Sequence, residues 1–398
     1  MPNPESPIPN PGFTATDHAL MAHALRLAER GAFTTKPNPM VGCVLAREGE
    51  IVGEGWHQRA GGPHAEVIAL QQAGENARGA TAYVTLEPCS HVGKTGPCAE
   101  ALVAAGVSRV VGAMRDPNPL VDGEGFAHLR AAGIDVEIGL MEPLARALNH
   151  GFLSRIERGR PWLRIKLAIS IDGRSAMASG ESKWISGEAA RQDVQRWRAR
   201  SGAILTGAGT VLIDDPSLTV RLEGDVPEYE RDFVPPLRVI LDPGLATVAR
   251  GRVREGDAPT LYIHAADARM PRGIDTPHAH VPVHSGRFDL DAVLQLLAAR
   301  GINEVQVEAG ATLAGAFLAA GLVDELLLYV APVVLGERAR PMFDGLPIDT
   351  MAERLRMRVL ETRRIGDDVR LLLQPGGGGL QPQVAGEVAP GVEALVIP

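Results

Sequence analysis

One histidine and two cysteines, set in two short motifs, place the strongest constraint on what this chain can fold into. The segment 63–66 reads PHAE, the segment 88–89 reads PC, and a further cysteine, Cys98, comes nine positions after Cys89. An imidazole and two thiolates fill three positions of a tetrahedral zinc site and leave the fourth open, as catalytic zinc sites do. The sequence therefore predicts that His64, Cys89 and Cys98 hold one Zn²⁺ ion at a reaction centre.

Glu66, two positions after His64, indicates the reaction type. Zinc deaminases of nucleobases carry the pattern H-x-E … P-C-x-x-C, in which the glutamate is the general acid and base. This chain matches H-x-E and P-C but has a longer gap between its cysteines. His91 lies in that gap and is a rival ligand; we favour His64, because His91 would leave Glu66 unexplained. His64 and Cys98 both stand at predicted helix starts, where backbone N–H groups favour the thiolate that a metal binds.

The longer gap belongs to a wider pattern. The runs HAE at 64–66, PCSHVGKTGPC at 88–98, PNPMVGC at 37–43 and DPNP at 116–119 resemble the deaminase half of the bifunctional riboflavin-biosynthesis deaminase/reductases. The resemblance continues over about residues 15–373. It implies zinc-dependent hydrolytic deamination of 2,5-diamino-6-(5-phosphoribosylamino)pyrimidin-4(3H)-one, with Glu66 moving the proton. It also implies a set of substrate contacts, which are Asn38, His57, Lys94, Asp116 and Asn118. Asn38 and Asn118 adjoin prolines, so ordinary turn formation is an alternative explanation for both.

The second half of the chain lacks a G-x-G-x-x-G loop in a convincing strand–helix setting, and the GAG at 207–209 is a partial match only. An ordinary Rossmann dehydrogenase is therefore not supported. Four strings stand out instead, at 166–174 (KLAISIDGR), 180–184 (GESKW), 206–216 (TGAGTVLIDDP) and 308–317 (EAGATLAGAF). The last string joins a predicted strand to a predicted helix, whose first N–H groups suit a phosphate. A tight connection with small packing residues is the alternative.

These strings resemble the dihydrofolate-reductase-like domain of the same bifunctional family. The resemblance implies that NADPH reduces the ribosyl group of 5-amino-6-(5-phosphoribosylamino)uracil to ribityl. It implies cofactor contacts from Ala168, Trp184, Thr210, Asp214, Gly310, Ala311, Thr312, Leu313, Ala314, Gly315 and Ala316. It implies substrate contacts from Lys166, Ser182, Arg198, Leu218, Arg221 and Glu308. The new alkoxide needs a proton, and the sequence does not choose between Lys166 and Asp214 as the catalytic donor.

Helices and strands alternate along both halves, which indicates α/β architecture. We expect an N-terminal cytidine-deaminase-like three-layer α/β/α domain and a C-terminal dihydrofolate-reductase-like α/β domain. The segment 149–161 has several arginines and little apolar periodicity, which places the domain junction there. The predicted organisation is a flexible N-terminus at 1–14, a deaminase domain at 15–148, a linker at 149–161, a reductase domain at 162–374 and a flexible Gly/Pro-rich tail at 375–398.

Composition narrows the choice of partners. A net charge of −8 and only 4% aromatic residues count against a nucleic-acid base deaminase with a non-catalytic second domain, because strand binding favours basic and aromatic surfaces. A zinc-stabilised binding or regulatory protein is a further alternative, but it leaves Glu66 and the open ligand position unexplained. Sparse cysteine and the lack of an apolar run of about 20 residues predict a cytoplasmic protein without membrane partners. The resemblance implies small-molecule phosphoribosylaminopyrimidine substrates, and we expect no nucleic-acid partner. We also expect a homo-oligomer.

Overall fold

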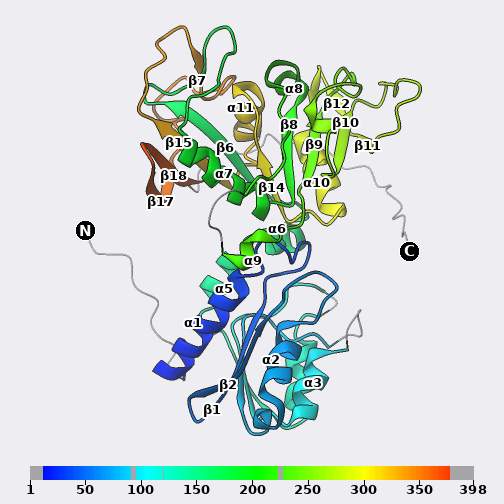
Figure 1. Cartoon of the computed structure of the whole chain (residues 1–398), viewed down its shortest axis with the longest axis vertical. Coiled ribbons are helices and arrows are strands. Elements are labelled where there is room, and N and C mark those ends of the chain that lie inside the picture. Colours follow the sequence, from blue (N-terminus) through cyan, green and yellow to red (C-terminus); the bar gives the residue numbers. More distant parts are fainter. Residues whose placement is uncertain (1–11, 91–95, 120, 223–226, 377–398) are drawn as a thin grey trace.

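The computed structural model describes residues 12–90, 96–119, 121–222 and 227–376, which form two lobes (Figure 1). The first lobe holds a five-stranded sheet and the second a nine-stranded sheet. Helices cover both sheets, so the predicted α/β fold class is confirmed. Within these residues no helix is long and apolar enough to cross a membrane.

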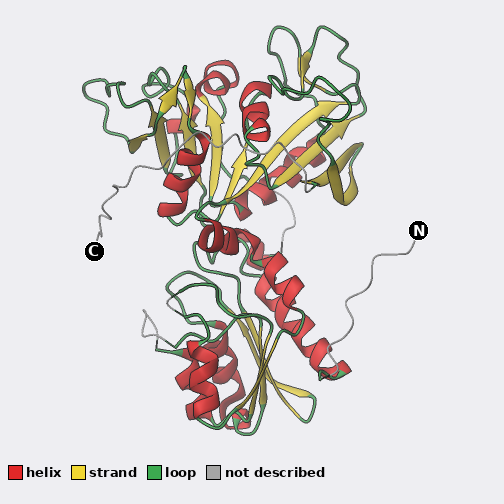
Figure 2. Cartoon of the chain, turned by 180° about the vertical axis from the view of Figure 1, so that it is seen from behind, coloured by secondary structure: helices red, strands yellow, loops and turns green. Residues whose placement is uncertain are grey.

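The first lobe is built in three layers (Figure 2). Its elements are α1 Ala15–Glu29, β1 Gly42–Arg47, β2 Glu50–Trp56, α2 Ala65–Ala73, η1 Gly74–Ala77, β3 Thr81–Val84, α3 Cys98–Ala105, β4 Arg109–Gly112, α4 Glu124–Ala131, β5 Asp135–Ile138 and α5 Glu142–Leu148. The strand order is β2-β1-β3-β4-β5, with β1 antiparallel to β2 and β3, and with β3, β4 and β5 parallel. Apolar side chains of α1 and α5 cover one face, and those of α2, α3 and α4 cover the other.

Glycines in β1 and β2 allow two helices to lie directly on the sheet. A Cβ on Gly42 would lie 2.0 Å from the carbonyl oxygen of Ala24 in α1. A Cβ on Gly53 would lie 2.3 Å from the carbonyl oxygen of Ala69 in α2. This close approach holds α2 firmly against β2, and the first turn of α2 carries the predicted zinc motif.

The second lobe contains one large sheet with the order β11-β10-β9-β8-β14-β6-β15-β18-β17. From α6 onward the elements are α6 His150–Arg158, β6 Trp162–Ser170, β7 Arg174–Ala176, α7 Glu188–Arg200, β8 Ala203–Gly207, α8 Ala208–Asp214, α9 Glu228–Arg231, β9 Leu237–Leu241, η2 Arg252–Arg254, β10 Thr260–His264, β11 His278–His280, β12 Val283–His284, β13 Arg287–Phe288, α10 Leu290–Ala299, β14 Glu304–Val307, α11 Ala311–Ala319, β15 Glu325–Ala331, β16 Arg340–Pro341, β17 Met357–Ile365 and β18 Asp368–Pro375. The strands from β11 to β15 are parallel, and β18 and β17 are antiparallel. Helices α10 and α11 pack on one face and α7 packs on the other. The carboxyl ends of parallel strands are where such sheets bind ligands.

Several segments differ from the expectations. The predicted linker contains α6, whose buried Phe152 and Leu153 join the apolar core of the first lobe, with Ile156 packed against it. These three positions form a short apolar stripe at helical spacing. The GAG motif does lie at a strand–helix junction, because β8 leads directly into α8. The strand β17 was not predicted, because arginines interrupt its apolar alternation. The predicted flexible ends lie almost wholly outside the described residues, and the domain bounds stay predictions.

Candidate active sites

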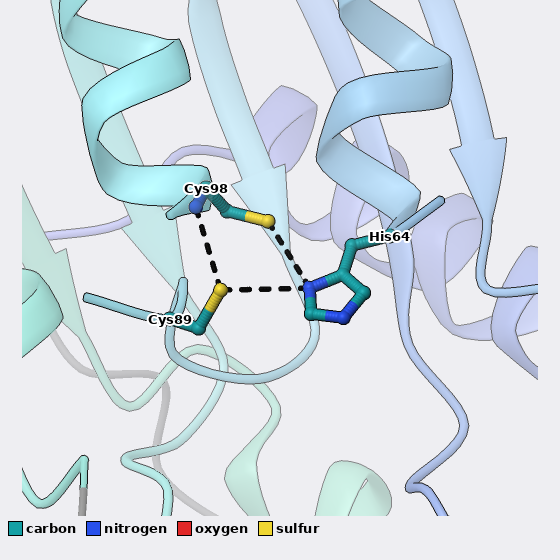
Figure 3. A group of neighbouring side chains, drawn as sticks. All are labelled: His64, Cys89 and Cys98. Atoms are coloured by element: carbon teal, nitrogen blue, oxygen red, sulfur yellow. Dashed lines mark hydrogen bonds between the residues drawn. The ribbon is translucent and has the colours of Figure 1, made fainter. Parts of the chain in front are cut away.

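Three side chains of the first lobe converge at one point (Figure 3). Nδ1 of His64 lies 3.2 Å from Sγ of Cys98 and 3.5 Å from Sγ of Cys89, and these three atoms lie within 4.8 Å of one another. The backbone N–H of Cys98 also donates to Sγ of Cys89 across 3.4 Å. Ligand atoms around a tetrahedral zinc ion at ordinary bond lengths lie about 3.5–3.8 Å apart. The donor set and its spacing therefore fit Zn²⁺.

The local fold presents each of these donors. His64 is the N-cap residue of α2 and makes no side-chain cap bond. Cys98 is the first residue of α3 and is fully buried, whereas Cys89 lies in the loop between β3 and α3. Hydrogen bonds from the Cys98 thiol and from His64 lower the pKa of Cys89 to about 4, although burial opposes this. The rival ligand His91 lies outside the described residues.

Glu66 stands in the first turn of α2 beside these donors. Its side chain is only 3% exposed. This burial raises the pKa of Glu66 to about 7, although a backbone hydrogen bond and the nearby His64 favour its charged form. The carboxyl group also interacts with the Cys98 thiol. A buried carboxyl with a pKa near neutrality can both accept and return a proton.

Asn38 and His57 lie next to this group. Nδ1 of His57 donates to the carbonyl oxygen of Pro63 at 3.1 Å, so Nε2 of the same ring accepts from Nδ2 of Asn38 at 3.1 Å. The His57 ring packs edge-on against the His64 ring, with centroids 5.4 Å apart. Burial lowers the pKa of His57, which keeps the ring neutral and able to accept. His57 therefore orients the amide of Asn38.

The loop after β4 is fixed by a carboxylate that the sequence reasoning missed. Glu87 directly precedes the PC motif and is 4% exposed. Its two carboxylate oxygens accept four backbone N–H groups, from Asp116 at 3.2 Å, Gly123 at 3.1 Å, Gly125 at 2.9 Å and Phe126 at 3.3 Å. An acidic residue next to a predicted ligand was the available signal. Glu87 thus ties the Cys89 loop to the loop that carries Asp116.

The remaining predicted substrate contacts of the first site are Asp116, Asn118 and Lys94. Oδ1 of Asp116 accepts from the backbone N–H of Asn118 at 2.9 Å. This is the turn hydrogen bond expected of an aspartate before proline, so the turn explanation accounts for the local backbone. Lys94 lies outside the described residues.

A cavity of about 2320 Å³ opens in the second lobe at the carboxyl ends of β6, β8 and β14. Pockets for one small ligand usually measure about 300–1,000 Å³, so this cavity has room for a dinucleotide and a second ligand. The predicted residues that line it are Lys166, Ala168, Ser182, Trp184, Arg198, Thr210, Asp214, Leu218, Arg221, Glu308, Gly310, Ala311, Thr312, Leu313 and Ala316.

Ala314 and Gly315, which belong to the predicted run of cofactor contacts, do not line the cavity. Ala314 is fully buried in the apolar core between α11 and the sheet. A Cβ on Gly315 would lie 2.1 Å from the carbonyl oxygen of Asp344. The helical repeat turns both positions away from the cavity. Gly310 is the N-cap residue of α11 without a side-chain cap bond, so the first N–H groups of this helix stay available to an anion.

A charged cluster forms one wall of the cavity. The Arg198 guanidinium and the Glu308 carboxylate make a bidentate pair, with Nε–Oε1 at 2.7 Å and Nη2–Oε2 at 2.8 Å. The buried Gln306, which the sequence reasoning missed, donates to Oε1 of Glu308 at 2.9 Å. Burial favours the neutral acid, but Arg198 and Lys166 outweigh it and lower the pKa of Glu308 to about 2. Burial lowers the pKa of Lys166, and Glu308 opposes that shift.

The opposite wall offers polar groups and an aromatic face. Oγ of Ser182 donates to Oδ1 of Asp214 at 3.4 Å, and Nζ of Lys183 donates to the Asp214 carbonyl oxygen at 2.7 Å. Trp184 is 70% exposed, and the Arg191 guanidinium lies 4.7 Å from the centroid of its ring. An exposed indole beside a cation provides a surface on which a flat heterocycle can stack.

Comparisons with known families match both lobes. A family described as the RibD C-terminal domain matches residues 161–371, which is more than half of the chain. A family described as the cytidine and deoxycytidylate deaminase zinc-binding region matches residues 14–114. The second match spans His64, Cys89, Cys98 and Glu66.

Full-length relatives give the same result. The riboflavin biosynthesis protein RibD of Escherichia coli K12 is 50% identical over 365 residues, which are 90% of this chain and 99% of that protein. RibD of Haemophilus influenzae is 45% identical over 370 residues, covering 92% and 99% of the two chains. The structure of Acinetobacter baumannii RibD superposes with a TM-score of 0.84 at 47% identity, over 91% of this chain and 99% of that one. A Thermotoga maritima diaminohydroxyphosphoribosylaminopyrimidine deaminase/5-amino-6-(5-phosphoribosylamino)uracil reductase superposes with a TM-score of 0.80 at 32% identity, with the same coverage.

The two lobes and their sites define a bifunctional enzyme, in which a zinc-dependent deaminase is joined to an NADPH-dependent reductase. The chain belongs to the RibD family and carries out a deamination and a reduction in riboflavin biosynthesis. The predicted resemblance, function and cofactors are thereby confirmed.

Proposed function

We propose that His64, Cys89 and Cys98 hold the zinc ion and that Glu66 moves the protons of the deamination. When bound there, zinc supplies the Lewis acidity that makes water nucleophilic at neutral pH. Glu66 takes a proton from the attacking water and gives it to the ring nitrogen of 2,5-diamino-6-(5-phosphoribosylamino)pyrimidin-4(3H)-one. It then takes the second proton, from the hydroxyl group now on the carbon, and gives it to the amine, which leaves as ammonia while the carbonyl forms. The burial that raises the pKa of Glu66 to about 7 supports this double use.

The pyrimidine is bound by residues from loops that meet beside the zinc ligands. Asn38 contacts the substrate through its amide, and His57 acts by orienting that amide with its Nε2 atom. Asp116 and Asn118 supply further contacts from the loop that Glu87 holds. Lys94 meets the sugar phosphate as a compact cation, an assignment that rests on the sequence alone.

In the second lobe, bound NADPH supplies the hydride that reduces the ribosyl group of 5-amino-6-(5-phosphoribosylamino)uracil. The cofactor contacts are Ala168, Trp184, Thr210, Asp214, the turn Gly310–Leu313, and Ala316, and the substrate contacts are Lys166, Ser182, Arg198, Leu218, Arg221 and Glu308. Of the two candidate proton donors we favour Lys166. Its lowered pKa makes it a readier donor, whereas the Asp214 carboxylate already accepts a hydrogen bond from Ser182.

The observation that carries the proposal is the convergence of one imidazole and two thiolates beside the buried Glu66. The test is a two-step assay that follows ammonia release and then NADPH oxidation. Removal of zinc with a chelator is expected to abolish ammonia release while NADPH oxidation with pre-formed deaminated substrate continues. Ammonia release that survives complete zinc removal would contradict the assignment, and so would parallel loss of both reactions without unfolding.

We further propose that the enzyme works in the cytoplasm as a homo-oligomer, without nucleic-acid or membrane partners, and that its domains span 15–148 and 162–374. The net charge of −8 supports the absence of a nucleic-acid partner, because a polyanion needs a basic surface. Light scattering at micromolar concentration is expected to give a mass of at least twice 42.2 kDa. A monomer over the whole concentration range would contradict the oligomer.

A further inference from the structure

The loop after α1 reaches the junction of the two lobes, where α6 and α9 lie (Figure 1). At this junction Nζ of Lys36, a residue of the first lobe, donates to three backbone carbonyl oxygens of the second lobe. These acceptors are Ala199 at 2.5 Å, Ser201 at 2.9 Å and Val234 at 3.2 Å. One side chain thus binds two separate segments of the reductase lobe.

The acceptors explain why a lysine stands at this position. Helix α7 ends at Arg200, where the backbone N–H of Ser201 binds the carbonyl oxygens of Trp197 and Arg198. The carbonyl group of Ala199, in the same last turn, has no partner within the helix. Burial lowers the pKa of Lys36 to about 7, and the nearby Glu304 favours its charged form. In that form the ammonium group donates in three directions from a single atom and brings a positive charge to the negative end of the helix dipole. A planar guanidinium does not reproduce that arrangement. Lys36 is one of only four lysines among 40 basic residues of the chain.

A second hydrogen bond holds the next residue. Nδ2 of Asn303, at the start of β14 in the second lobe, donates to the carbonyl oxygen of Pro37 at 2.8 Å. Oδ1 of Asn303 accepts from Nε of Arg155 at 2.7 Å, which fixes the orientation of the Asn303 amide. The backbone at 36–37 is therefore held by the reductase lobe on two sides.

Asn38 directly follows Lys36 and Pro37, the two residues that the reductase lobe holds by hydrogen bonds. Its backbone N–H donates to the carbonyl oxygen of Thr35 at 2.8 Å, and its side chain reaches Nε2 of His57 at 3.1 Å. The turn at 35–38 is short, so a displacement of Lys36 moves Asn38 as well. The reductase lobe thus determines where a residue beside the zinc ligands lies.

We propose that Lys36 is a positioning residue through which the reductase lobe holds Asn38 in the deaminase site. The inference rests on the proposed role of Asn38 as a contact of the pyrimidine substrate. The hydrogen bonds of Lys36 act on Asn38, a residue proposed to bind substrate, and leave Glu66 in place. Loss of these hydrogen bonds therefore weakens substrate binding and spares proton transfer. The signature is a raised KM for deamination at nearly constant kcat.

The test compares Lys36→Met, which keeps the length of the side chain and removes its donors, with Arg59→Met. Arg59 forms an exposed ion pair with Asp232 across the same junction and is the matched control. We expect Lys36→Met to raise the deaminase KM about tenfold with kcat changed less than about twofold. Zinc content, and the reductase kcat with pre-formed substrate, are expected to stay at the wild-type level. Arg59→Met is expected to leave all four quantities unchanged.

A double-mutant cycle separates action through Asn38 from a general effect on the fold. If Lys36 acts through Asn38, Lys36→Met raises KM no further in an Asn38→Ala background. Asn303→Ala removes the second hydrogen bond and is expected to raise KM about threefold, which provides an independent test if Lys36→Met folds poorly.

Three outcomes would overturn the inference. The first is an unchanged deaminase KM in both Lys36→Met and Asn303→Ala, and the second is a KM effect of Lys36→Met that multiplies with that of Asn38→Ala. Either of these leaves the proposed role of Asn38 intact. The third is an unaffected deaminase in Asn38→Ala, which removes both that role and the inference built on it.

Discussion

The deaminase site and the reductase cavity are built on different scales. The three metal-binding donors lie within 4.8 Å of one another and come from the starts of two helices and the loop between β3 and α3. The reductase cavity measures about 2320 Å³ and takes its lining from strings spread between 160 and 347. A metal ion demands a few donors at short fixed distances, whereas two large organic ligands need a wide surface. A metal site is therefore concentrated in a short motif, and a cavity depends on how distant elements pack.

The largest expected effect concerns the compact site. Glu66→Gln keeps the shape of the side chain and removes the proton carrier, so ammonia release is expected to fall by about 10²–10⁴-fold. Zinc content and NADPH oxidation with pre-formed substrate are expected to stay unchanged. Glu100→Gln, at an exposed position in the first turn of α3, is the control. Near-normal deamination by Glu66→Gln would remove Glu66 from its role.

The charged wall of the cavity tests the second site. Arg198→Leu leaves the largely buried Glu308 carboxylate, whose side chain is 12% exposed, without its bidentate partner. This is expected to cost the reductase lobe about 3 kcal/mol of unfolding free energy. NADPH oxidation is expected to fall at least about tenfold, because the same pair faces the proposed substrate. Arg196→Leu, on the same helix but in an exposed pair with Glu230, is expected to cost less than about 1 kcal/mol. Denaturant unfolding measures the loss of stability, and steady-state kinetics measure the loss of NADPH oxidation. Equal effects of the two variants would contradict the proposed role of the Arg198–Glu308 pair.

A smaller effect is expected at the open aromatic face. Trp184→Ala removes the indole on which we propose that a flat ring of NADPH stacks, and stacking of a base on an aromatic side chain is worth about 1–3 kcal/mol. The Kd for NADPH measured by calorimetry is expected to rise about tenfold, and Trp184→Phe is expected to recover most of it. Ammonia release stays as in the wild type. An unchanged Kd in Trp184→Ala would place the cofactor elsewhere in the cavity.

The smallest effect is a dependence of stability on pH. Burial raises the pKa of Glu308, but its cations outweigh burial and lower it from 4.5 to about 2. A depressed carboxyl pKa contributes stability above the ordinary value, and this contribution is lost as the pH falls toward the folded-state value. The stability advantage of the wild type over Glu308→Gln is therefore expected to shrink between about pH 5 and pH 2. Thermal unfolding of both proteins across that range measures it, and a constant difference would refute the shift.

The same contrast of scale explains what the sequence predicts. The zinc motif, the helix starts at His64 and Cys98, and the α/β order follow from local spacing, and the structure brings the three donors together as expected. In the predicted cofactor run at 310–316, the first turn lines the cavity. Ala314 and Gly315 face the core instead, because exposure to the cavity follows the helical repeat and not the order of residues in the string.

Other features depend on partners that are distant in the chain. Glu87 binds backbone groups about 30–40 residues away, and Lys36 binds carbonyls more than 160 residues away. The backbone groups that these two side chains bind cannot be recognised in the sequence, because every position carries a backbone carbonyl and nearly every position a backbone N–H. Helix α6 was not predicted because its apolar stripe, Phe152, Leu153 and Ile156, is short and lies among arginines.

The central claim is that one imidazole and two thiolates hold zinc beside Glu66 and leave one coordination position to the reaction. X-ray absorption at the zinc edge of the purified, metal-loaded enzyme tests it most directly. We expect two sulfur and two lighter scatterers per zinc ion, with a single imidazole that His64→Ala removes. Two imidazoles per zinc, or an imidazole that persists in His64→Ala, would contradict the account.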